Sequence, residues 1–145
     1  MAVETALASV MFFALLFGVF DFSHVFYCES TLKYAVSQAA RFATTGNTVE
    51  DEGNPGTQLS REDSILEVIR DLSGFDDLGP SHVTVSAITS GGASVAGAGG
   101  PGDVVTVRAQ YGVSLLSPYL SRFYGDGTYR FEVLTTFRNE EFPGA

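Results

Sequence analysis

Residues 5–20 form an uncharged, strongly apolar run between two acids, Glu4 and Asp21. On a membrane-insertion scale, the apolar side chains from Leu7 to Phe20 contribute roughly −3 to −5 kcal/mol, whereas one central acid costs about +3 kcal/mol. Insertion is therefore favourable only if both acids lie at the edges of the bilayer. The run is close to the length of about 20 residues that a spanning helix needs. We expect residues 1–20 to form the half of a helix that lipid or other apolar helices surround.

A secretory signal peptide is the first alternative for such a run. Signal peptides carry a basic head and a small-residue cleavage site after a shorter apolar core. Here the head carries Glu4, and the run continues into FDFSHVFYCESTLKY without a cleavage-like site. The pattern therefore favours a helix that is retained.

Helical spacing continues beyond Asp21, because apolar residues recur every three or four positions. They are Phe22, Val25, Leu32, Val36, Ala39 and Ala43. This spacing predicts a helix that ends at Thr44 or Thr45, with Gly46 as its C-terminal cap. At 1.5 Å per residue its length is roughly 60 Å, about twice the thickness of the bilayer hydrocarbon. We expect residues 21–45 to be an amphipathic half outside the membrane, with a stripe of small side chains suited to close packing.

Residues 46–145 predict a small α+β domain. After a polar loop over 46–58, Ser60 and Asp63 resemble a capping box, which predicts one short helix that ends at Gly74. Its expected apolar face consists of Ile65, Val68, Ile69 and Leu72. Apolar and polar residues alternate over 83–87, 105–111 and 129–137, which predicts an antiparallel sheet of about three strands with one wet face. The long helix can cover the dry face.

Two connections between these strands stand out. Residues 89–103, TSGGASVAGAGGPGD, predict a flexible hairpin connection. A phosphate-binding loop is not favoured there, because no Gly-Lys-Ser/Thr follows. Residues 114–127 predict a helical turn that lies at the edge of the core or meets a neighbour. Its apolar side chains are Leu115, Leu116, Tyr119, Leu120 and Phe123.

Charge and cysteine usage exclude several classes. The chain has 17 acids against 8 basic residues and a net charge of −9, so it offers no basic stripe for nucleic acid. Cys28 is the single cysteine, which excludes an intramolecular disulfide and a cysteine metal cluster. Acids also cluster at 50–52, 76–77 and 140–141, all in predicted loops or the tail, and we interpret them as solvated.

Asp21, His24 and Cys28 share one face of the predicted helix. In principle they could bind zinc, or Cys28 could act as a nucleophile with His24 as its base. No second ligand cluster and no orienting third group accompany them, so we favour polar residues at a membrane or subunit boundary, with Cys28 a small buried residue. We expect no enzyme: no catalytic residue, no cofactor and no metal.

The N-terminal residues resemble TadE-like pseudopilins, relatives of type IV pilins that tight-adherence pilus machines assemble. The resemblance rests on Ala2-Val3-Glu4, Phe17-Gly18 with Asp21 and Phe22, Tyr27, Leu32, Ala35 and Ala40-Arg41-Phe42-Ala43, with a weaker likeness at 105–111 and 138–140. It implies a pilin-like fold and a precursor that a prepilin peptidase cuts after a glycine. It also implies a stage in the inner membrane, then export by an assembly platform into an extracellular filament.

This resemblance makes a structural pilus subunit that serves adhesion our first hypothesis. Met1 and Glu4 would then act in filament assembly, with the carboxylate of Glu4 paired to the α-amino group of Met1 in the same or an adjacent subunit. The filament core would contain Phe12, Phe13, Leu16, Phe17 and Phe20. Two alternatives stay open: a minor pseudopilin that primes or tips the filament, and a single-pass membrane-anchored binding module. We expect the partners to be other copies of the chain and other pilins, and no nucleic acid.

Overall fold

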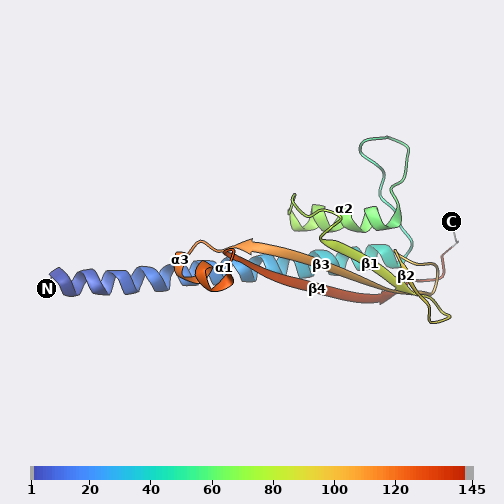
Figure 1. Cartoon of the computed structure of the whole chain (residues 1–145). Coiled ribbons are helices and arrows are strands. Elements are labelled where there is room, and N and C mark those ends of the chain that lie inside the picture. The colour runs from blue at the N-terminus through green and yellow to red at the C-terminus, as the bar shows by residue number, and fades with distance from the viewer. Residues whose placement is uncertain (1, 143–145) are drawn as a thin grey trace. The chain divides into compact units, whose positions relative to one another are not determined.

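The structure is a computed structural model, and it describes residues 2–142. Figure 1 shows the elements in chain order. The helices are α1 (Ala2–Thr44), α2 (Arg61–Ser73), α3 (Pro118–Ser121) and the 3-10 turn η1 (Arg122–Tyr124). The strands are β1 (Val83–Ile88), β2 (Ser94–Ala96), β3 (Val104–Ser114) and β4 (Thr128–Arg138). They form one sheet in the order β2-β1-β3-β4. The predicted α+β fold, a long N-terminal helix with a small antiparallel sheet, is confirmed.

The chain divides into two compact units. The first consists of Met1–Ser30 and Gly112–Phe131, and the second of Thr31–Tyr111 and Glu132–Ala145. The first unit therefore holds the apolar half of α1 with α3 and η1. The second holds the C-terminal part of α1, α2, β1, β2 and most of β3 and β4.

In the second unit, the C-terminal part of α1 is buried along a stripe of small and apolar residues. The stripe consists of Leu32, Ala35, Val36, Ala39, Ala40 and Ala43. The helix ends at Thr44, as predicted, and Gly46 follows with a φ of 74°. A Cβ at Gly46 would lie 2.7 Å from the ring of Phe142, so both the backbone and the space require glycine there.

The cap of α2 is confirmed, but its buried face differs from the prediction. The N–H of Asp63 donates to the side chain of Ser60, and Gly74 ends the helix in the left-handed conformation. Ile65 and Ile69 are buried as expected, whereas Leu72 is exposed. The buried arc includes Ser64, whose hydroxyl accepts a hydrogen bond from the N–H of Val49. The preceding loop thus covers a side of the helix that the apolar pattern did not mark.

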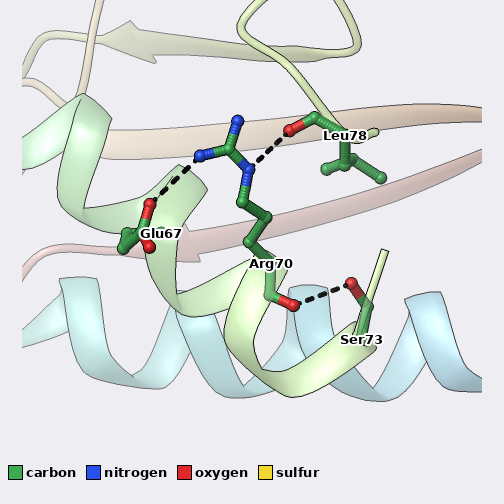
Figure 2. Close-up of polar contacts among 4 residues, drawn as sticks. All are labelled: Glu67, Arg70, Ser73 and Leu78. Carbon is green, nitrogen blue, oxygen red and sulfur yellow. Dashed lines mark hydrogen bonds and ion pairs between the residues drawn. The ribbon is translucent and has the colours of Figure 1, made fainter. Parts of the chain in front are cut away.

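Arg70 fastens the C-terminal end of α2 to the loop that follows (Figure 2). Its Nε donates to the carbonyl of Leu78 at 3.0 Å, and its Nη1 lies 3.3 Å from the carboxylate of Glu67. The hydroxyl of Ser73 donates to the Arg70 carbonyl. Leu78 is fully buried, so these contacts fix the loop where it enters the core.

The sheet contains one strand more than predicted. Residues 94–96 lie in the glycine-rich tract that we expected to be a flexible connection, yet they pair with β1 as an antiparallel strand, with Ala87 opposite Val95. A short turn makes this possible, because the N–H of Thr89 donates to the carbonyl of Ala93. In β3, Val105, Val107 and Ala109 are buried and their neighbours are more exposed, as the alternation predicts. Two further short helices, α3 and η1, replace the single predicted turn.

Arg61 and Asn139 join distant segments of the second unit. The guanidinium of Arg61 donates to the carbonyls of Ala43, Ala98 and Gly99, and it also bonds Asn139 Oδ1. The amide of Asn139 donates to the carbonyls of Ala98 and Gly100. Burial lowers the pKa of Arg61. The end of α1, the start of α2 and the chain after β4 are thus held by one polar cluster.

Candidate functional site

The apolar half of α1 is exposed. This helix is long and apolar enough to cross a membrane, and none of its most apolar window is buried within the chain. The predicted packing residues Phe12, Phe13, Leu16, Phe17 and Phe20 are between 36% and 60% exposed. An uncovered apolar surface of this extent is typical of a segment that lipid or another protein covers. Their role in packing stays a prediction.

Glu4 lies in the first turn of α1 and is exposed. An acid in the first helical turn interacts favourably with the helix dipole, by about 0.3–1 kcal/mol. This effect holds for any helix and assigns no role to Glu4. Met1, which we expect to pair with Glu4, lies outside the described residues.

Asp21 marks the end of the apolar half, and it is 1% exposed. Its Oδ1 accepts a hydrogen bond from the N–H of Leu116 at 2.7 Å, and its Oδ2 accepts one from the N–H of Ser117 at 2.9 Å. The hydroxyl of Ser117 also donates to Oδ2. A buried carboxylate is tolerated when hydrogen bonds to the charged form replace its water. Asp21 therefore fixes the start of α3 on α1.

Tyr119 of α3 contacts α1 at Ala14, which is closer to the N-terminus of α1 than Asp21 is. The hydroxyl of Tyr119 donates to the carbonyl of Ala14, and a Cβ at Gly18 would come within 3.0 Å of that oxygen. Glycine at position 18 leaves room for the phenol. Tyr119 and Leu120 form one wall of an open apolar groove of about 490 Å³, whose other wall is α1 from Met11 to Phe22.

The three residues that we weighed as metal ligands lie in different environments. Asp21 is buried and bonded to the loop, Cys28 is buried as expected, and His24 is exposed. Among residues 2–142, no group of three or more His, Cys, Asp or Glu side chains could hold a metal ion. Asp21 is thus a structural carboxylate in this fold.

The loop acids make local contacts. Hydrogen bonds from the Asn54 side chain and the N–H of Gly53 lower the pKa of Asp51, and Glu50 accepts from the N–H of Gly56. Asp77 accepts from the hydroxyl of Tyr111. These contacts shape turns, and we assign no binding role to them.

Sequence reasoning missed the joint role of Gly18 and Asp21. The two positions are three residues apart and hence share one helix face, which was a visible signal. Their partners, however, are Tyr119 and the 116–117 backbone, which lie far away in the sequence. Only the tertiary structure brings them together.

Comparison with known families supports the likeness seen in the sequence. The family model described as TadE-like protein matches residues 1–41, a range that includes Glu4, Gly18 and Asp21. The predicted resemblance is confirmed over that range, and it suggests a protein related to tight-adherence pili. Comparisons with curated proteins and with solved structures found no match.

Proposed function

We propose that this chain, whose first 41 residues match the TadE-like family, is a structural subunit of a tight-adherence type pilus. It polymerises through the apolar half of α1 into a surface filament for adhesion. The observation that carries the proposal is the contrast along α1. Residues 32–43 bury a stripe in their own domain, whereas the window before them is uncovered. The apolar side chains in the first half of such a helix are buried only when other molecules surround them.

Before assembly, the apolar half of α1 lies in the cytoplasmic membrane. In this arrangement residues 1–20 span or enter the bilayer, residues 21–45 project from it, and residues 46–145 form the extracellular domain. A prepilin peptidase and an inner-membrane assembly platform are the implied partners at this stage. Asp21 lies where the apolar run ends.

In the filament, the apolar halves of neighbouring copies pack together at the centre. Lipid tails are as apolar as leucine, so leaving the bilayer yields little hydrophobic energy, and close van der Waals contact must stabilise the bundle. Small side chains permit close approach of helices. The first half of α1 supplies Ala2, Ala6 and Ala8 between its large residues. Phe12, Phe13, Leu16, Phe17 and Phe20 then fill the space between helices.

Glu4 is the residue that makes this assembly selective. An unpaired carboxylate inside an apolar bundle would cost several kcal/mol. Pairing with an α-amino group, that of Met1 in the same or an adjacent copy, removes this cost only when the helices are in register. The acid thus acts as a check on subunit position.

The test replaces Glu4 by alanine in the full chain. We expect Glu4→Ala to insert into the membrane at the normal level and to form no fibres by electron microscopy. The matched control is Glu52→Ala, which removes the same charge from an exposed loop and should leave fibres unchanged. Normal fibres that contain the Glu4→Ala chain would refute the role of Glu4, whereas normal fibres that lack the chain would favour an anchored binding module.

A further inference from the structure

The segment from Leu115 to Tyr124, which contains α3 and η1, lies on the apolar half of α1. Its Tyr119 hydroxyl bonds the carbonyl of Ala14, and Asp21 bonds the start of the segment. Ala14 and Asp21 are seven positions apart, which at 1.5 Å per residue is roughly 10 Å along the helix. The segment therefore covers about 10 Å of the apolar run, from its end at Asp21 toward its centre at Ala14.

The polar groups at the start of this segment are satisfied within the chain. The backbone N–H groups of Leu115, Leu116 and Ser117 donate to Gly127 and to Asp21, and Pro118 has no N–H. The hydroxyl of Ser121 donates to the Pro118 carbonyl. Because these groups are paired, the start of the segment can contact hydrocarbon without leaving a backbone donor unsatisfied.

Several apolar side chains of the segment are exposed. Leu116 is 72% exposed and Phe123 is 84% exposed, and Tyr124 is also exposed. Arg122 is the single charged residue between positions 115 and 125, in a chain whose net charge is −9. Exposed aromatic and leucine side chains beside one basic residue are typical of segments that lie at the surface of an anionic membrane.

We propose that residues 115–124 are a second membrane-contacting element, which lies in the interfacial layer of the bilayer beside α1 before assembly. Its partner is the lipid surface: Leu116 and Phe123 enter the boundary between headgroups and acyl chains, and Arg122 faces the anionic headgroups. The continuity of the segment with the candidate membrane helix and the exposure of Leu116 and Phe123 favour lipid as the occupant, with the exposed Arg122 available to an anionic headgroup. The inference rests on the membrane stage of the proposed function. It adds that residues 115–124, together with α1, set how deeply α1 lies in the bilayer.

Tryptophan reporters can test this directly, because the chain contains no tryptophan. Full-length Leu116→Trp and Phe123→Trp variants are placed in phosphatidylcholine–phosphatidylglycerol vesicles whose acyl chains carry bromine at a shallow or a deep position. Phe12→Trp reports insertion of α1. Leu134→Trp, a second exposed leucine on β4, is the matched control for Leu116→Trp.

We expect emission from positions 116 and 123 to shift to shorter wavelength and to be quenched more by shallow than by deep bromine. Position 12 should be quenched by deep bromine, and position 134 by neither. If position 12 is quenched while positions 116 and 123 behave like position 134, the inference is wrong and membrane insertion stands. A shift at 116 and 123 without bromine quenching, growing with protein density, would identify a second copy as the occupant and overturn it. Absence of quenching at position 12 would overturn the membrane stage and the inference together.

Discussion

Replacing Asp21 by alanine removes the acceptor that holds the start of α3. Two backbone N–H groups and one hydroxyl then lose their partner. A buried donor left without an acceptor costs about 1–3 kcal/mol. Ser117 is fully buried, whereas the N–H of Leu116 is only partly buried and regains water. We therefore expect Asp21→Ala to lower the free energy of local opening of the segment by about 2–4 kcal/mol.

Amide hydrogen exchange of the full chain in detergent micelles measures this opening. Since about 1.4 kcal/mol is a factor of ten, exchange at the amides of residues 116 and 117 should become about 30- to 700-fold faster in Asp21→Ala. Ser117→Ala keeps both backbone bonds and loses only the hydroxyl, so it should cost about 1 kcal/mol. Amides of β1 and β3 serve as an internal reference.

The matched control is Asp71→Ala, which removes an exposed carboxylate from α2. It should leave exchange at residues 116 and 117 unchanged. If Asp21→Ala and Asp71→Ala gave the same exchange rates at these amides, the buried carboxylate would not hold the segment, and the argument from its hydrogen bonds would be refuted.

Three other outcomes follow from the structure. Gly18→Val should weaken attachment of the α3 segment by about 1–3 kcal/mol when Tyr119 is present and much less with Tyr119→Ala, as a double-mutant exchange cycle would measure. Asn139→Ala should lower the free energy of unfolding by about 1–3 kcal/mol in denaturant titrations, because two carbonyls and a guanidinium lose a partner. The control Asn54→Ala, in an exposed loop, should change the free energy of unfolding by less than about 0.5 kcal/mol. Hydrogen bonds from the Arg130 side chain and the N–H of Thr128 lower the pKa of Asp126. The stability that these bonds contribute should be fully present above the ordinary aspartate pKa and be lost as the pH falls through the lowered pKa. Carboxyl NMR can follow this titration.

Local signals in the sequence predicted the elements that local chemistry controls. The capping box at Ser60, the end of α1 before Gly46 and the alternation in β3 each depend on neighbouring residues, and each is confirmed. The apolar half of α1 was evident for the same reason. Periodicity and caps act over a few residues, so a single sequence is enough to read them.

Features that depend on distant partners were not predicted. The strand β2 lies in a tract of Gly, Ala and Ser whose composition is typical of a flexible loop, and it pairs with β1, which is a distant contact for a local pattern. Asp21 looked like a polar residue at a boundary, because its partners at 116 and 117 are remote in the sequence. The exposed half of α1 is an apolar surface that lipid or another protein can cover.

The composition of purified surface fibres tests the central claim most directly. Fibres sheared from cells that make this protein should contain the chain as the repeating subunit, labelled along their whole length by antibodies against residues 46–142. Cryo-electron microscopy of the same fibres should place the apolar halves of α1 at the centre. Fibres that lack the chain, or that carry it only at a tip, would contradict the account.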